Sequence, residues 1–204
     1  MIQTHFRTQF SITAMLVGLI VGGCSSSDNS TVAIDVSNPE VAIADGEEPT
    51  QDQIDRMLKA KEALFTQLSG RLMETMGAQG PVAAISVCQK EAPKIASDVG
   101  SEQGLKIGRT GVRLRNPDNA APAWATALTD AKTDTAHFVS LTNGHAAALL
   151  PIKLQGQCLM CHGPTSQISP VIQEQLAKLY PNDQATGFKE GELRGWFWVE
   201  LPNG

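Results

Sequence analysis

Residues 135–152, TAHFVSLTNGHAAALLPI, carry the clearest folding signal in the chain. Two stretches suited to β-strands flank Asn143-Gly144, and an Asn-Gly pair supplies both positive φ angles of a two-residue type I′ turn. We therefore predict an antiparallel hairpin in which Thr142 lies opposite His145.

The sequence before and after this hairpin predicts helices and further strands. Apolar residues recur with helical spacing after Thr50, which has Gln53 at the capping-box position. Pro81 suits the first turn of a second helix, which Pro93 would break or kink. The other expected elements are a strand at residues 106–114, a short helix at 124–128, a helix at 168–179 and a buried strand at 195–201. Helices followed by an antiparallel sheet that helices interrupt define the α+β class.

Composition restricts the class of protein. The chain has 204 residues, of which 42% are apolar and 18% charged, and this suits one globular domain with tails rather than a disordered, collagen-like or coiled-coil protein. The net charge is -5, and residues 25–50 contain six acidic residues and no Lys or Arg. The remaining part, residues 51–204, is neutral, so nothing indicates a nucleic-acid partner.

The first 24 residues have the features of an export signal. Arg7 is followed by an apolar run at residues 12–21 that is too short to span a bilayer, and residues 21–24 read VGGC. This stretch resembles the lipobox of bacterial lipoproteins, in which cleavage precedes the cysteine and Cys24 would carry the lipid. The alternatives are a secretory signal that contains Cys24 by coincidence and an uncleaved anchor.

These features divide the chain into three parts. We expect a lipoprotein signal peptide at residues 1–23, an acidic flexible tether at 24–50 and a single domain at 51–204, because the tether has too few large apolar residues to form a core. The domain would lie outside the cytoplasm, lipid-anchored at the periplasmic or outer-membrane side of a bacterial envelope. The lipid would be its only membrane contact.

The candidate chemistry is concentrated in the sequence CLMCH at residues 158–162. Two thiols at this spacing can add to the two vinyl groups of one haem, and the following histidine can then coordinate the iron. The motif is the attachment signature of c-type cytochromes. It predicts one covalently attached haem c, with Cys158 and Cys161 as the thioether residues and His162 as an axial ligand.

Three other types of site use cysteine pairs. A structural zinc site needs four ligands, and a second cysteine pair is missing. A thioredoxin-type pair follows a strand and begins a helix, whereas Gly163-Pro164 follows this pair. A disulfide between positions three apart is geometrically awkward. We therefore favour haem c.

Cys88 is the thiol that remains once Cys24 and the haem motif are assigned. A free thiol in an oxidising compartment needs an explanation: either it is a small buried apolar residue or its thiolate is the second axial ligand of the iron. No methionine follows the motif, which disfavours a small soluble cytochrome c. The remaining candidates are His137 and His145, which the predicted hairpin register places on opposite faces of the sheet.

Seven segments, in order along the chain, resemble those of one family. They are GPVAAISVC (80–88), APKIA (92–96), RTGVRLRNP (109–117) with Asn119 and Pro122, PI (151–152), CLMCHG (158–163), YP (180–181) and GELRG (191–195). They are similar to the single-haem c-type domains with a PAS-like fold, and the resemblance covers about residues 52–202. It implies a PAS-like antiparallel sheet flanked by helices. It also implies that Cys88 faces the haem as the distal ligand.

The resemblance also bears on the residues around the haem. Gly111 departs from the family, which more often has a small hydroxyl residue there. Three arginines, Arg109, Arg113 and Arg115, would share one face of the strand at 106–114, where guanidinium groups could bind the haem propionates. The family pattern favours Arg109 for this role, and a solvated basic stripe is the alternative. Trp196 and Trp198 are expected in the core.

The leading functional hypothesis is a redox or small-ligand sensor. If the bond between iron and Cys88 breaks on reduction, CO or NO could bind and the helix carrying Cys88 could signal to a partner protein. The alternative is an electron-transfer lipoprotein with no sensing role. Whether the protein is an enzyme stays open, although no acid–base pair is evident beyond the two histidines.

Overall fold

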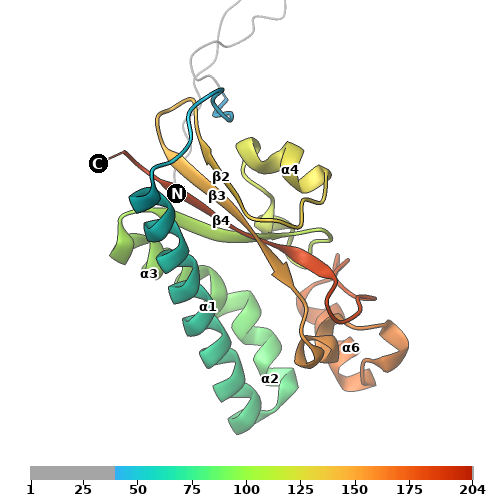
Figure 1. The fold of residues 1–204 in the computed structure, drawn as a ribbon. Helices are drawn as coiled ribbons and strands as arrows, with labels where there is room; N and C mark the ends of the chain where they lie inside the picture. Colours follow the sequence, from blue (N-terminus) through green and yellow to red (C-terminus); the bar gives the residue numbers. More distant parts are fainter. Residues whose placement is uncertain (1–39, 204) are drawn as a thin grey trace, which may run out of the picture. The chain divides into compact units, whose positions relative to one another are not determined.

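The computed structural model describes residues 40–203. Its centre is an antiparallel sheet of four strands in the order β1-β4-β3-β2. The strands are β1 (Lys106–Gly111), β2 (His137–Ser140), β3 (Ala146–Lys153) and β4 (Leu193–Leu201). Helices lie on both sides of this sheet (Figure 1), so the predicted α+β class is confirmed.

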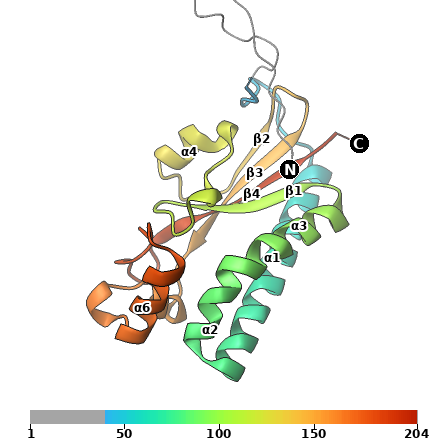
Figure 2. The same cartoon turned by 180° about the vertical axis from the view of Figure 1, so that it is seen from behind.

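Helix α1 (Gln51–Gln79) covers one face of the sheet. It begins as predicted, because the Thr50 hydroxyl accepts from the Gln53 backbone N–H and the Gln53 side chain accepts from the Thr50 backbone N–H. Its buried residues Met57 and Leu64 pack against even-numbered residues of β3. The lower half of α1 extends past the sheet, where α2 lies beside it (Figures 1 and 2).

A continuous helical segment follows Gly80. It consists of α2 (Pro81–Ser86), the π-helical turn η1 (Val87–Glu91) and α3 (Ala92–Gln103). Pro93 cannot donate a backbone hydrogen bond, and its ring crowds the preceding turn. The widened turn accommodates this proline, so the helix neither breaks nor ends where the sequence predicted a break or kink.

The opposite face of the sheet is covered by the segment between β1 and β2. The 3-10 turns η2 (Pro117–Asn119) and η3 (Ala123–Ala125) lead into α4 (Thr126–Asp130), close to the predicted short helix. Trp124 and Trp196 are buried there, and the Trp196 indole N–H donates to the Thr133 carbonyl at 2.6 Å. The core role expected of Trp196 is therefore confirmed, whereas Trp198 is only partly buried at the edge of the same cluster.

The hairpin between β2 and β3 forms, but its predicted turn is wrong. The Leu141 backbone N–H donates to the His145 carbonyl, and the Gly144 N–H donates to the Leu141 carbonyl, so the loop has three residues instead of two. Only Gly144 has a positive φ, at 81°, whereas Asn143 does not. This is a type I turn followed by a glycine bulge, which an Asn-Gly pair also satisfies.

The segment before α1 adds to the free edge of the hairpin. The Ala44 N–H donates to the Ser140 carbonyl at 2.8 Å, and the Thr142 N–H donates to the Ala42 carbonyl at 2.9 Å. Part of the predicted tether therefore lies along β2. The predicted signal peptide and Cys24 lie outside the described residues, and within residues 40–203 no helix has the length and apolarity that crossing a membrane requires.

The chain between β3 and β4 carries the cysteine motif. It forms the 3-10 turn η4 (Gly156–Cys158), the short helix α5 (Leu159–His162), the 3-10 turn η5 (Thr165–Gln167) and α6 (Pro170–Leu179). Helix α6 agrees with the helix predicted at residues 168–179. Its residues Ile172 and Leu176 pack with Ile85 of α2, so α6 and α2 face one another below the sheet (Figure 2).

Candidate functional site

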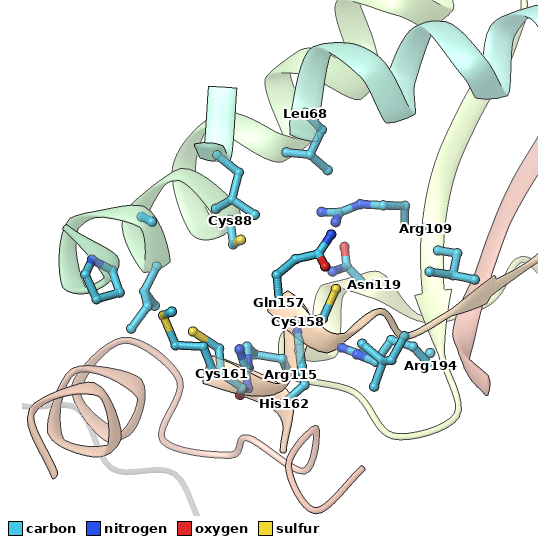
Figure 3. Close-up of a pocket in the computed structure, with 18 of the residues that line it drawn as sticks. Leu68, Cys88, Arg109, Arg115, Asn119, Gln157, Cys158, Cys161, His162 and Arg194 are labelled. Atoms are coloured by element: carbon cyan, nitrogen blue, oxygen red, sulfur yellow. Dashed lines mark hydrogen bonds between the residues drawn. The ribbon is translucent and has the colours of Figure 1, made fainter. Parts of the chain in front are cut away.

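A deep pocket lies between α1, α2 and the cysteine motif. Its cavity volume is about 230 Å³ and it opens to solvent, and its lining is mainly apolar with a few polar groups. Ligand pockets commonly have this composition. Four predicted residues, Cys88, Cys158, Cys161 and His162, all line it, and Figure 3 shows the Cys88 side chain across the pocket from the motif.

His162 is held in one orientation. Its Nδ1 lies 2.7 Å from the carbonyl oxygen of Ala185, and because a carbonyl only accepts, Nδ1 carries the proton. The ring is then neutral, and its Nε2 carries the free electron pair. Burial, together with the positive charges of Arg115 and Arg194, lowers the pKa of His162 well below its usual value. A neutral imidazole with its other nitrogen tied to a carbonyl is the arrangement that metal-binding histidines use.

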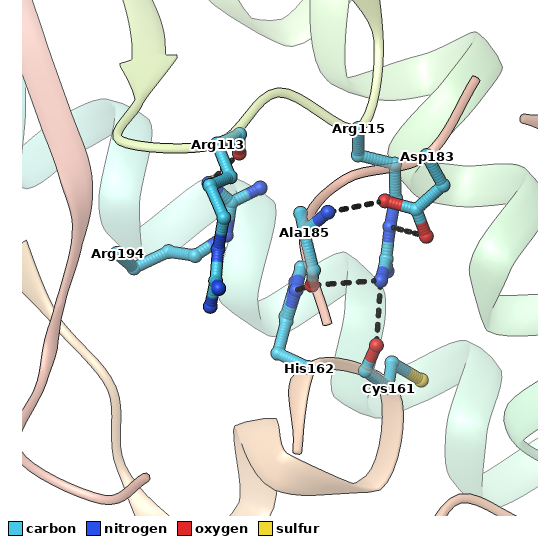
Figure 4. Close-up of polar contacts among 7 residues, drawn as sticks. All are labelled: Arg113, Arg115, Cys161, His162, Asp183, Ala185 and Arg194. Atoms are coloured by element: carbon cyan, nitrogen blue, oxygen red, sulfur yellow. Dashed lines mark hydrogen bonds and ion pairs between the residues drawn. The ribbon is translucent and has the colours of Figure 1, made fainter. Parts of the chain in front are cut away.

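Arg115 donates hydrogen bonds to the backbone around the motif (Figure 4). Its Nε donates to Asp183 at 2.9 Å, and one terminal nitrogen donates to the carbonyls of Cys161 at 2.5 Å and Ala185 at 3.2 Å. Arg115 is only 8% exposed, so these charge-assisted bonds are shielded from water. The same Ala185 carbonyl thus holds both Arg115 and His162.

The two motif cysteines are free thiols in the same wall of the pocket. Cys158 packs beside Leu154 and Phe188, and Cys161 packs beside the apolar cluster around Ile172. Burial raises the pKa of the Cys161 thiol. Gly163 follows directly, and a side chain there would lie 2.6 Å from the Leu159 carbonyl, so the tight end of the motif requires glycine.

Cys88 lies in the opposite wall, on the π-helical turn. This turn is tied to α6 by the Gln89 side chain, which donates to the Leu179 carbonyl at 2.9 Å. It is tied to α1 by Glu91, which accepts from Arg71 at 2.6 Å. The Arg71 guanidinium lowers the pKa of Glu91, although both groups are partly exposed. A π turn shifts the following residues around the helix axis, and such turns are frequent at functional sites.

The comparisons with known proteins agree with this fold. The model of the Tll0287-like family matches residues 32–202. The chain belongs to the Tll0287-like family. The crystal structure of the cyanobacterial heme-protein Tll0287 is similar to it, with 25% sequence identity and a TM-score of 0.55, over 76% of this chain and 98% of that chain. No curated protein matches the sequence.

The arginines of this Tll0287-like chain do not share one face as predicted, because β1 ends at Gly111 and strand alternation does not continue beyond it. Arg109 lines the pocket, and burial lowers its pKa. Arg113 is exposed, and its guanidinium lies 4.0 Å from the centre of the Phe188 ring. Arg115 also reaches the pocket, but most of its donors bind protein oxygens.

Arg194 is a pocket residue that sequence reasoning missed. It stands at the second position of β4 and reaches into the pocket from the side opposite Cys161 (Figure 3). Its guanidinium donates to the Arg113 carbonyl at 3.0 Å. The available signals were a charged residue at the start of a mainly apolar strand and its place in the segment GELRG at residues 191–195.

Neither candidate histidine of the hairpin lines this pocket. His137 pairs with Leu149, and His145 lies opposite Leu141, so the true register places both on the sheet face that α1 does not cover. The prediction that they occupy opposite faces is wrong, because it depended on the two-residue turn.

Proposed function

We propose that this chain is an exported, lipid-anchored protein that carries one haem c and acts as a redox or small-ligand sensor. One observation carries the proposal: a pocket has Cys158, Cys161 and His162 in one wall and Cys88 in the facing wall. The similar cyanobacterial protein is described as a heme-protein. The PAS-like sheet implied by the sequence resemblance supports a sensory role.

The pocket suits haem in its chemistry. An apolar lining accepts the porphyrin, the free Nε2 of His162 suits iron, and the two thiols suit the vinyl groups. Each thiol would add across one vinyl double bond, with its hydrogen passing to the vinyl carbon, so attachment needs no oxidant. A bound haem would supply one-electron redox chemistry and an exchangeable coordination position.

Cys88 is proposed as the distal ligand in the ferric state. A thiolate donates negative charge to the metal and stabilises its ferric form, so we expect a low reduction potential. On reduction by one electron from a partner protein, Cys88 would leave the iron and take up a proton. The vacated position would admit CO or NO, and the turn carrying Cys88 would report the change to a partner in trans.

Electron transfer without sensing is the second candidate. Met160, between the two attachment cysteines, lines the pocket and is 41% exposed. The haem edge beside it would therefore be open to a redox partner. In this case Cys88 would stay bound in both oxidation states.

The export and lipid anchor are proposed from the sequence at residues 21–24. Cys24 would become the first residue and carry the lipid, holding the domain at the periplasmic or outer-membrane side of a bacterial envelope. Metabolic labelling with a fatty acid tests this: the chain should incorporate label, and a Cys24→Ala variant should not.

Covalent attachment is tested by expression with a haem c maturation system, followed by denaturation and intact-mass measurement. The wild-type chain and a Cys88→Ala control should each retain one haem mass. A Cys158→Ala/Cys161→Ala variant should lose it. Haem that dissociates from the denatured wild-type chain would contradict the attachment.

The sensory role is tested by adding CO to the reduced, haem-loaded protein. Sensing predicts a spectral change on reduction that reports loss of the sulfur ligand, followed by CO binding. Unchanged six-coordinate spectra and no CO binding would favour electron transfer.

A further inference from the structure

Two cations in the pocket have no acidic partner. Among residues 40–203, Arg109 and Arg194 take part in no ion pair, although both are partly buried. Asp183 is the acidic residue whose charge acts on Arg194, and it already forms an ion pair with Arg115. The pocket therefore holds unbalanced positive charge.

Unbalanced buried charge favours a ligand of opposite sign. A guanidinium removed from water loses hydration, and a carboxylate that accepts two of its N–H groups restores the balance. Burial, then the neighbouring charges of Arg115 and Arg109, lower the pKa of Arg194 to about 10, and the Asp183 carboxylate opposes this only in part. Haem carries two propionate carboxylates, and the pocket offers two such arginines.

We propose that Arg194, with Arg109, binds the haem propionates, and that Gly111 is the residue that admits Arg194 to the pocket. This inference rests on the proposed haem function. Of the three arginines predicted from the sequence, Arg109 keeps the propionate role, and Arg194 takes the place of Arg113 and Arg115. Figure 3 shows Arg109 and Arg194 on the same side of the pocket, away from Cys161, so one end of the site is cationic.

Because Gly111 has no side chain, it leaves the space that the Arg194 guanidinium occupies. A Cβ atom built on Gly111 would clash with the Arg194 guanidinium and lie 3.0 Å from the Arg113 carbonyl oxygen. That carbonyl is the acceptor that orients Arg194. Any side chain at position 111 would therefore push the guanidinium away from its present place.

Arg113 provides a matched control. Its guanidinium and that of Arg194 both lie over the Phe188 ring, at 4.0 and 5.6 Å from the centre. Arg113 is exposed and does not line the pocket. Loss of either arginine removes one positive charge near the site, but only Arg194 is placed to bind a ligand.

The test is the midpoint potential of the haem-loaded protein measured against pH. The charged groups around Arg194 are Arg109 on β1, Arg113 and Arg115 after it, and Asp183 after α6. All proteins in this test carry Cys88→Ser, because a Cys88 that takes up a proton on reduction would itself make the potential depend on pH. In this parent protein, paired propionates stay ionised and the potential stays flat in mildly acidic solution. In Arg194→Gln, an unpaired propionate binds a proton more readily when the iron is reduced, so the potential falls as pH rises, with a slope of up to one proton per electron.

Three further variants make the test specific. Gly111→Ala should reproduce the new slope, Arg194→Lys should restore the flat profile in part, and Arg113→Gln should leave the profile parallel to that of the Cys88→Ser parent. A flat profile in Arg194→Gln would overturn the proposal, even if Gly111→Ala fails to fold. Failure of the haem function is distinguishable, because the wild-type chain would then carry no haem mass.

Discussion

The wall that carries His162 is held by buried polar contacts of Arg115 and His162, whereas the wall that carries Cys88 is held mainly by apolar packing, with one hydrogen bond from Gln89 and a partly exposed ion pair. Arg115 and the Ala185 carbonyl fix the first wall through directional bonds of 2.5 to 3.2 Å. Ile85 packs the second wall onto α6. Polar networks fix orientation, but apolar contacts are non-directional. The imidazole is thus held by directional bonds and the thiol by less directional contacts, a difference that the proposed ligand exchange at Cys88 would require.

Removing the buried Arg115 should have the largest effect, because it disrupts the polar contacts that hold the first wall. In Arg115→Met, Asp183 keeps a buried charge without a partner, and the free energy of unfolding should fall by about 3–5 kcal/mol. Guanidinium unfolding of the haem-loaded protein measures the loss. Arg113→Met, which removes only an exposed cation over Phe188, should cost less than about 1 kcal/mol. Similar losses in the two variants would contradict a special role for the buried network.

Loosening the other wall should affect Cys88 and spare His162. Ile85 is 3% exposed, and Ile85→Ala should lower the free energy of unfolding by about 2–5 kcal/mol through the cavity it leaves. It should also broaden the spectral features that depend on sulfur ligation. Val171→Ala on α6 is the control, because Val171 is 55% exposed and contributes little. Unchanged sulfur ligation in Ile85→Ala would mean that packing does not position Cys88.

The ion pair between Arg71 and Glu91 should have the smallest effect. Arg71 lowers the pKa of Glu91 below its ordinary value of 4.5. A lowered folded-state pKa stabilises the fold above that ordinary value, and the contribution is lost as pH falls through the folded-state pKa. Glu91→Gln should therefore cause a small loss of stability at neutral pH that disappears in acid and in high salt.

Denaturation at several pH values, with Glu102→Gln as an unpaired control on α3, measures this difference. A loss in Glu91→Gln that persists in acid would assign it to packing instead of charge. The second wall would then be held by apolar contacts and the Gln89 hydrogen bond, with no contribution from charge, and the contrast between the two walls would sharpen.

Local signals in the sequence predicted most of the elements. The capping box at Thr50 and Gln53 located the start of α1, and the alternating or continuous apolar runs located β3 and β4. The CLMCH motif and Cys88 were identified by composition and spacing, and the fold brings them to one pocket. These features depend on neighbours in sequence, which is why they could be predicted.

Features that depend on distant parts of the chain could not be predicted. Asn143-Gly144 satisfies two turn types, and only pairing with the rest of the sheet selects the three-residue loop. The Arg115 guanidinium is chemically suited to bind a propionate, yet it forms an ion pair with Asp183, which lies far along the chain. Arg194 is placed at the pocket by its contacts with β1 and the segment after it, where a Cβ on Gly111 would clash with its guanidinium.

The central claim is that Cys88 and His162 bind one iron from facing walls, and low-temperature EPR of the ferric, haem-loaded protein tests it most directly. The wild-type chain should give a low-spin signal typical of thiolate ligation. Cys88→Ser, a change of one atom, should abolish that signal while the haem mass and the circular dichroism stay the same. Identical EPR spectra in the two proteins would contradict the account and return Cys88 to a packing role.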